Sequence, residues 1–181
     1  MTDADQFEAF VREFQDMVFA TAVRLLGNPA EAEDVAQTVF LKAYERFGAG
    51  GPGPAAPGWL KTVATNICLN HLSRHRARWR LFSEMSRPES DTDTTSFEAS
   101  LVSGSSPAAD VERADEAEGL ETALRALPDH QRVPLVLFHF EDRSYQEIAA
   151  TLGVSVGKVK TDIHRGREAL RSWFTREHGS C

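Results

Sequence analysis

The stretch that most constrains the fold of this chain is residues 144–171, which predicts two short helices joined by a tight turn. Ser144 is a suitable N-cap, and Glu147 three residues later can complete a capping box. Gly153 suits the left-handed residue that ends a helix. Ser155 can then cap the second helix. The expected inward residues are Ile148, Ala149 and Leu152 in the first helix and Val159, Ile163 and Leu170 in the second.

The second of these helices has a basic outward surface. Between residues 156 and 176 the chain has six Lys or Arg residues, opposed only by Asp162 and Glu168. A cationic helix after such a turn is typical of a helix-turn-helix, whose second helix enters the DNA major groove. An ordinary helical hairpin with a solvated basic face is the alternative. The expected outward residues are Lys158, Lys160, Thr161, His164, Arg165 and Arg167.

The net charge of −7 over 181 residues is unevenly distributed. Residues 48–83 contain no acidic side chain and five Lys or Arg, whereas residues 84–121 contain eleven acidic side chains and two basic ones. Local charge matters more than the sum when a protein binds a polyanion. Two basic regions separated by an acidic one therefore remain compatible with DNA binding.

The composition also indicates the cellular compartment of the chain. No apolar run is long enough to span a bilayer, and the acidic N-terminus lacks the order of a signal peptide, so we expect a cytoplasmic protein without membrane insertion. Two distant cysteines imply no disulfide framework. Whether Cys68 or Cys181 has a redox role stays open.

The N-terminal part predicts an all-α domain. A first helix ends at Gly27, and a second has Asn28 as N-cap, Pro29 at its first position and Glu31 to complete a capping box. Residues 48–58, rich in Gly and Pro, predict a surface loop. The expected core residues are Phe7, Phe10, Val11, Phe14, Met17, Val18, Thr21 and Leu25, then Ala32, Val35, Ala36, Val39, Phe40, Ala43, Tyr44 and Phe47.

A third helix is expected from about Pro57 and ends in residues 73–82, SRHRARWRLF. Alternating arginines around Trp79 suit a phosphate backbone and stacked bases. A basic helix end that complements the helix dipole is the alternative. The expected core residues are Leu60, Val63, Ala64, Ile67 and Leu72, with Thr62, Asn66, Asn70, Ser73 and Arg74 on another side.

Cys68, His71 and His75 have the spacing to share one helical face, which is the chemistry of a zinc site. No fourth ligand is evident nearby, and structural zinc sites need four. We therefore predict a buried thiol and two surface histidines, and no metal site.

Residues 84–110 are rich in Ser, Thr, Asp, Glu and Pro and predict a flexible acidic linker between two small helical domains, residues 1–83 and 111–181. Asp110 can cap the next helix, and Pro134 should bend the one after it or delay its start. The expected core residues are Val111, Ala117, Leu120, Leu124 and Leu127, then Leu135, Leu137, Phe138 and Phe140.

The two ends together resemble the sigma-70 family of bacterial transcription initiation factors, in its short extracytoplasmic-function form. The resemblance covers residues 7–82 and about 111–174. It rests on NPAEAEDVAQTVFLKAYERF and WLKTVATNICLNHLSRHRAR in the first part and on ALPDHQRVPLVLFHFEDRSYQEIAATLGVSVGKVKTDIHRGREALR in the second.

The resemblance implies roles for four regions. The second helix would dock on core RNA polymerase through Asp34, Gln37, Thr38 and Lys42. The −10 promoter element would be held by Lys61, Asn66, Asn70, Arg74, Arg76 and Arg78, with residues 48–58 as the loop that captures a flipped base. The −35 element would meet Lys158, Thr161, His164 and Arg165 at base edges and Ser155, Lys160, Arg167 and Arg171 at phosphates.

The sequence departs from the family pattern at three places. Asn70 stands where the family usually has Asp, which bears on how the helix end is held. Asp162 stands where a basic residue is common, so the −35 contacts are expected to be fewer or to be read differently. The loop of residues 48–58 has no side chain suited to grip a base. The base preference therefore does not carry over.

The predicted function is a promoter-specificity subunit with no catalytic residues and no cofactor, bound to core polymerase and promoter DNA and held by an anti-sigma protein. A one-component helix-turn-helix regulator is the alternative and predicts dimers on a palindrome. A DNA recombinase or hydrolase is the alternative from the enzyme class and would need a nucleophile or an acidic cluster that binds metal. Its nearest candidates, Glu31, Glu33 and Asp34, point to different sides of one helix.

Overall fold

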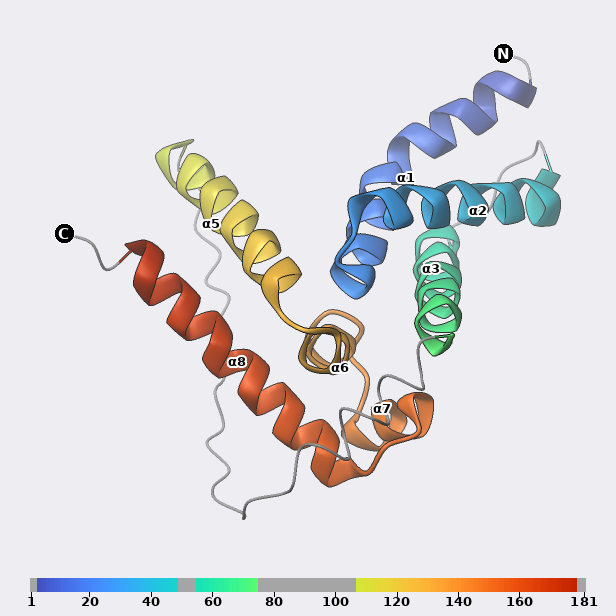
Figure 1. Cartoon of the computed structure of the whole chain (residues 1–181). Helices are drawn as coiled ribbons and strands as arrows, with labels where there is room; N and C mark the ends of the chain where they lie inside the picture. Colours follow the sequence, from blue (N-terminus) through green and yellow to red (C-terminus); the bar gives the residue numbers. More distant parts are fainter. Residues whose placement is uncertain (1–2, 49–54, 75–106, 179–181) are drawn as a thin grey trace.

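The computed structural model describes residues 3–48, 55–74 and 107–178, and every regular element in these ranges is a helix (Figure 1). This confirms the all-α prediction. A first unit consists of α1 (Asp3–Leu26), α2 (Pro29–Phe47) and α3 (Ala56–Ser73). A second unit consists of α5 (Pro107–Ala126), α6 (Asp129–His139), α7 (Tyr145–Leu152) and α8 (Val156–His178).

The first unit is built on α1, which packs against both α2 and α3. Aromatic rings pack together in this unit. The centroid of the Phe10 ring lies 5.1 Å from that of Phe14 and 6.1 Å from that of Phe40. The turn between α1 and α2 uses Gly27 at φ 68°, and Asn28 then accepts from the N–H groups of Ala30 and Glu31 as the predicted N-cap.

Two local predictions in the first unit are wrong. Tyr44 is 52% exposed rather than part of the core, because its ring packs edge-on against Phe7 at the rim of the α1–α2 contact. The Glu31 carboxylate does not complete a capping box. It lies 3.5 Å from His71 Nε2 on α3 instead, so a contact between helices replaces a local one.

The second unit is arranged around α6, whose residues 132–137 are all buried. α8 packs against one side of it and α1 against another. α8 approaches α6 closely at Gly166, where an added Cβ would lie 2.9 Å from Leu135 Cδ1 and 3.4 Å from the Gln131 carbonyl oxygen. A side chain at this position would push α8 away from α6.

Two predictions for the start of this unit are corrected, and a third is corrected in part. α5 begins at Pro107, three residues before the predicted cap at Asp110. Ala117 is exposed although it lies on the same side of α5 as Leu124, because among the described residues of α5 the buried ones begin only at Ala123. Pro134 does not delay α6, which begins at Asp129 and contains Pro134 among its buried residues.

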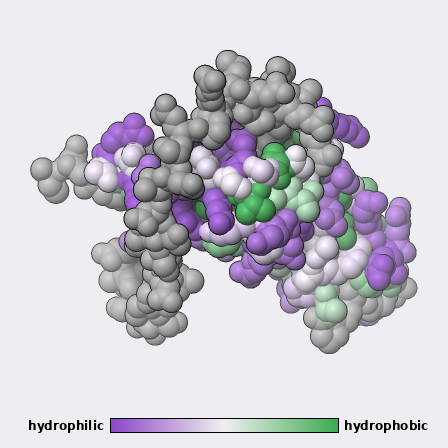
Figure 2. All heavy atoms as spheres, turned by 90° about the horizontal axis from the view of Figure 1, so that it is seen from below, coloured by the Kyte–Doolittle hydropathy of each residue, from purple (hydrophilic) through white to green (hydrophobic). Residues whose placement is uncertain are grey.

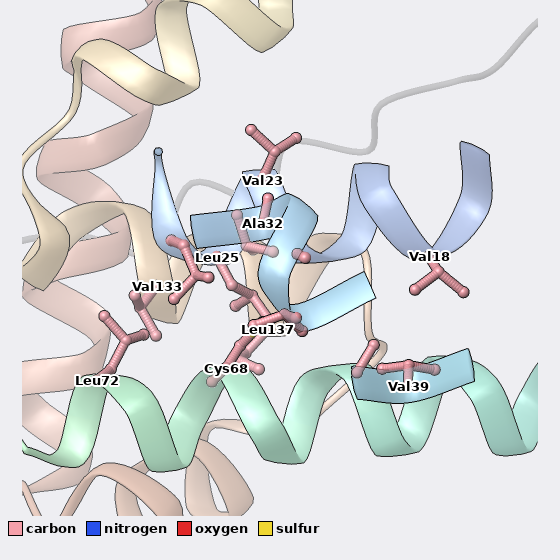
Figure 3. Close-up of a cluster of buried hydrophobic side chains, with 14 of the residues drawn as sticks. Val18, Val23, Leu25, Ala32, Val39, Cys68, Leu72, Val133 and Leu137 are labelled. Carbon is pink, nitrogen blue, oxygen red and sulfur yellow. The ribbon is translucent and has the colours of Figure 1, made fainter. Parts of the chain in front are cut away.

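Apolar side chains of both units form one continuous core. Figure 3 shows Val133 and Leu137 of α6 among Leu25 of α1 and Cys68 and Leu72 of α3. The helices of the two units are therefore in direct apolar contact, although the acidic residues 84–106 that join them in sequence lie outside the described ranges.

The described surface is mostly hydrophilic in the view of Figure 2, with a small group of hydrophobic atoms near its centre. Within the described ranges, no helix combines the length and the apolar character needed to cross a bilayer. The large apolar side chains with most exposure are Phe19, Leu41 and Tyr44.

Candidate nucleic-acid interface

The helix-turn-helix is formed by α7 and α8, and its caps are those that the sequence predicts. Ser144 Oγ accepts from Glu147 N–H at 3.2 Å, and the Ser144 N–H donates to Glu147 Oε2 at 2.8 Å. Gly153 ends α7 at φ 69°, and Ser155 Oγ accepts from Lys158 N–H at 3.1 Å. These local bonds fix the angle at which α8 leaves the turn.

The side chains of α8 divide into a buried side, an outward side and two flanks. Val159, Ile163 and Gly166 are buried against α6 and α7. At about 100° per residue, Thr161 and His164 lie on the opposite side, and both are exposed. Cationic side chains border them on each flank: Lys158 and Arg165 on one, and Lys160, Arg167 and Arg171 on the other.

This arrangement suits a helix in a major groove. Side chains at the centre of the outward side reach base edges, and cations on the two flanks reach the phosphates of the groove walls. Thr161 and His164 are thus the best-placed base-edge candidates. Lys158 and Arg165, which the resemblance assigns to bases, lie on a flank instead.

Lys158 is engaged within its own helix. Its ammonium lies 2.8 and 3.0 Å from the two carboxylate oxygens of Asp162, whose side chain is only 3% exposed. Asp162 is therefore buried and does not lie on the outward side of α8.

The other flank is positioned by rings of α6 and α7. Arg167 Nε donates to His139 Nε2 at 3.1 Å, and its guanidinium lies 5.6 Å from the centroid of Phe138. Burial and the Arg167 charge lower the pKa of His139, so its imidazole is neutral at pH 7 and can accept this bond. Lys160 Nζ lies 5.6 Å from the Tyr145 ring.

The −10 candidates on α3 occupy two different sides. Asn66, Asn70 and Arg74 are exposed, as expected. Lys61 lies about 140° around the helix from Asn66 and about 180° from Asn70. It shares the side of Thr65, which faces the second unit. Arg76 and Arg78, and most of the loop of residues 48–58, lie outside the described residues.

Lys61 contacts the turn between α6 and α7. Its Nζ donates to the Phe140 carbonyl oxygen at 2.7 Å and lies 3.7 Å from Glu141 Oε1. Thr65 Oγ1 donates to Glu141 Oε2 at 3.2 Å. Burial raises the pKa of Glu141 despite the neighbouring Lys61 charge.

The described part of α3 offers no metal site. Cys68 is fully buried, and desolvation raises the pKa of its thiol to about 12, so the thiolate that zinc needs is absent. His71 faces Glu31, and His75 lies outside the described ranges. No group of three His, Cys, Asp or Glu side chains within those ranges is close enough to hold a metal.

The four candidate polymerase contacts on α2 lie on one exposed surface. Asp34, Gln37, Thr38 and Lys42 are all exposed. Leu41 lies among them and is 66% exposed, which sequence reasoning missed. The sequence did indicate its position, because Leu41 follows Thr38, Gln37 and Asp34 by three, four and seven residues, which is the spacing of one helix side.

The fold and this site define a class: an all-α, two-unit protein with a DNA-binding helix-turn-helix in its second unit. Two family descriptions match the chain, Sigma-70 region 2 over residues 10–78 and Sigma-70, region 4 over residues 117–170. The first covers most of the unit α1–α3, and the second covers most of α5–α8.

Relatives match along nearly the whole chain. The ECF RNA polymerase sigma factor SigW of Bacillus subtilis is 32% identical over 93% of this chain and 89% of its own length. The RNA polymerase sigma-H factor of Pseudomonas aeruginosa is 35% identical over 93% and 86%. The sigma factor RpoE of Bartonella quintana, solved with the anti-sigma factor NepR, is 23% identical with a TM-score of 0.48, over 93% and 96%.

The chain belongs to the extracytoplasmic-function family of RNA polymerase sigma factors.

Proposed function

We propose that this chain is the promoter-specificity subunit of a bacterial RNA polymerase and has no enzymatic activity of its own. The first unit, within residues 1–83, binds core polymerase and the −10 element, and the second, within residues 111–181, binds the −35 element. The observation that supports this most directly is the outward side of α8, where Thr161 and His164 lie between two cationic flanks. Because polymerase and promoter DNA are cytoplasmic, the proposed place of action is the cytoplasm.

At the −35 element, Thr161 and His164 contact bases, and Ser155, Lys160, Arg167 and Arg171 contact phosphates. The flank position of Arg165 supports a phosphate contact for it as well. Lys158 would first have to leave its ion pair with Asp162. Replacing a base-contacting side chain should relax sequence preference, whereas replacing a phosphate-contacting one should weaken binding uniformly. T161A and K160A are a matched pair, because both residues are exposed on α8 and adjacent in sequence.

At the −10 element, the exposed side of α3 with Asn66, Asn70 and Arg74 holds the opened strand, together with Arg76 and Arg78. Bases released from the duplex gain contacts that the duplex cannot offer, so binding drives opening. Lys61 requires a change in its present contacts before it can bind DNA, since the turn after α6 occupies its ammonium.

Core polymerase is proposed to bind the surface of Asp34, Gln37, Thr38, Leu41 and Lys42. An exposed leucine surrounded by polar groups gives this surface an apolar centre and a polar rim, which is the arrangement of a protein interface. The variant L41D should abolish co-elution with core polymerase, whereas E13A on α1, also exposed, should not change it. Anti-sigma control is a further part of the proposal, taken from the family.

Run-off transcription with purified core polymerase tests the whole proposal. We expect transcripts that depend on the chain and on a promoter, and their loss in a variant that combines T161A and H164A. A one-component regulator would bind a palindrome as a dimer and give no such transcripts. Absence of promoter-dependent transcripts and of co-elution with polymerase would contradict the proposed function.

A further inference from the structure

Two aromatic rings are stacked beside one flank of α8. The Phe138 ring, near the end of α6, and the Tyr145 ring, at the first residue of α7, have an interplanar angle of 5° and 4.7 Å between their centroids. The ring of His139 meets that of Phe138 edge-on at 5.0 Å. The capping box of Ser144 and Glu147 fixes the main chain from which the Tyr145 side chain extends. The ring pair therefore joins the end of α6 to the start of α7.

Each of the two stacked rings attracts one cation of α8. Lys160 Nζ lies 5.6 Å from the centroid of Tyr145, and Arg167 Cζ lies 5.6 Å from the centroid of Phe138. Both distances are within the range of about 6 Å for a cation–π contact. The two cations are about two helical turns apart and so lie on the same side of α8. One ring pair from outside α8 thus contacts two cations of the same flank.

Arg167 has a second contact that restricts its orientation. Its Nε–H donates to His139 Nε2 at 3.1 Å. A guanidinium has five N–H groups, and this bond uses only the one on Nε. The two terminal amino groups keep the geometry with which arginine binds a phosphate through two parallel hydrogen bonds. The contact with His139 is therefore compatible with phosphate binding by the same side chain.

The opposite flank of α8 is held by a carboxylate instead of by rings. Lys158 Nζ lies 2.8 Å from Asp162 Oδ2, and the Asp162 side chain is buried. A carboxylate neutralises the charge of its partner, whereas a ring attracts a cation through its quadrupole and leaves the net charge unchanged. Lys160 and Arg167 are thus restrained and still fully charged toward a polyanion.

We propose that Tyr145, Phe138 and His139 are positioning residues of the −35 interface, which hold Lys160 and Arg167 in the geometry that binds the phosphates along one wall of the major groove. This inference rests on the proposed function of α8 and deepens it. It makes the affinity of this flank depend on side chains of α6 and α7.

Positioning matters because lysine and arginine have long, flexible side chains. A side chain that is free before binding loses rotamer freedom when a phosphate fixes it, and this loss reduces affinity. A cation that already lies against a ring loses less. The ring covers one side of the cation and leaves the other side to a phosphate. The rings should therefore strengthen DNA binding without contacting DNA themselves.

A double-mutant cycle at Tyr145 and Lys160 tests this role in the full chain. The probe is a labelled duplex of mixed sequence and about 20 base pairs, at low salt, because phosphate contacts do not depend on sequence. Y145L should weaken binding about threefold, as expected for loss of an exposed cation–π contact. Y145F keeps the ring and should bind as the parent chain does. In a K160A background, Y145L should have no further effect, because no ammonium is left to position.

The same cycle applies to Arg167. F138L and H139A should each weaken binding in the parent chain and have no further effect in an R167A background. W173L is the matched control, because Trp173 is an aromatic residue of the same unit whose ring packs near Gly119 of α5. It should keep the DNA affinity of the parent chain. Thermal unfolding followed by circular dichroism reports any packing loss in these variants separately from DNA affinity.

Two results would overturn the positioning role. The first is a loss of affinity in Y145L that is equal with and without Lys160, since the ring would then act only on the fold of α7. The second is tighter binding by Y145L, since the ring would then withhold the cation from DNA.

The single variants K160A and R167A separate this inference from the proposed function. If they weaken binding but Y145L, F138L and H139A do not, only the positioning role is wrong. If they also leave binding unchanged, this flank of α8 does not bind phosphates, and the proposed −35 contacts of Lys160 and Arg167 are wrong as well.

Discussion

The two sides of α6 pack in different ways. Toward α8, in the same unit, the contact is made by close approach of main chain and side chain, with Gly166 against Leu135 and Gln131. Toward α1, in the other unit, apolar side chains are accompanied by the buried Arg132 guanidinium, and beside this contact Arg24 of α1 pairs with Glu121 of α5.

The difference separates permanent from reversible packing. A closely fitted apolar contact has no polar groups that water can hydrogen-bond when the contact opens. Opening it therefore exposes apolar surface to water with no favourable hydration to offset the cost. Carbonyls and charged groups are readily hydrated once a contact opens, so the contact with α1 is the one suited to separation. Four changes test this comparison, from the largest expected effect to the smallest.

Arg132→Met should have the largest effect. Methionine keeps much of the apolar bulk but removes the donors for Leu25, Leu26 and Leu127, and we expect a loss of about 3 kcal/mol in unfolding free energy. Urea denaturation followed by circular dichroism measures it. R125M is the control, since Arg125 is exposed and should cost less than about 0.5 kcal/mol. Equal losses in the two variants would contradict an anchoring role for Arg132.

Gly166→Val should break the other side of α6. Branched atoms at this position overlap Leu135 and the Gln131 carbonyl, and overpacking should cost about 2 kcal/mol. G157V is matched to it, because Gly157 is also in α8 but a Cβ there meets nothing within 4 Å. Thermal unfolding of the two variants isolates the packing cost. A G166V chain as stable as G157V would show that the α6–α8 contact is looser than described.

Gly27→Ala and Gly153→Ala compare the stability lost in the turn after α1 with that lost in the turn after α7. Both glycines have nearly the same positive φ, 68° and 69°, so the backbone strain of about 1 kcal/mol should be shared. Only at Gly27 does the new methyl group also meet Arg132. We expect G27A to be less stable by about 1 kcal/mol more than G153A and to have a larger radius of gyration in scattering.

Glu141→Gln should give the smallest effect and a dependence on pH. Burial raises the pKa of Glu141 in the folded chain above its unfolded value. The stability linked to its protonation is therefore complete below the unfolded pKa and is lost as pH rises through the folded pKa. Glutamine cannot ionise, so E141Q should match the parent chain at acidic pH and become slightly more stable than it as pH rises.

Denaturation of E141Q and the parent chain at a series of pH values measures this difference. A parent chain that instead gains stability relative to E141Q with rising pH would mean that the Lys61 charge outweighs desolvation of the carboxylate. The ion pair of Glu141 with Lys61 would then stabilise the contact between the two units.

Local features of the fold were predictable from the sequence. The caps at Ser144 and Asn28 and the turn at Gly153 depend on bonds between residues a few positions apart. The outward position of Thr161 and His164 follows from helical spacing. The exposed side of α3 at Asn66 and Asn70 was predicted in the same way.

Contacts between distant segments were not predictable from such patterns. Whether Asp162 is buried, where Lys61 points and what Arg132 binds all depend on how helices pack. The sequence did contain one indication that α6 is buried between other helices. Residues 132–137 include an unbroken apolar run from Val133 to Leu137, which is typical of a helix covered on more than one side.

Arg132 binds main-chain oxygens at the end of α1, and this has a consequence for sequence variation. Every amino acid at positions 25 and 26 supplies the same carbonyl groups. Related chains can therefore change both side chains and keep the hydrogen bonds from Arg132. Position 27 has no such freedom, because any side chain there collides with the guanidinium. Across relatives, an arginine at 132 should therefore be accompanied by a glycine at 27 rather than by any particular pair of residues before it.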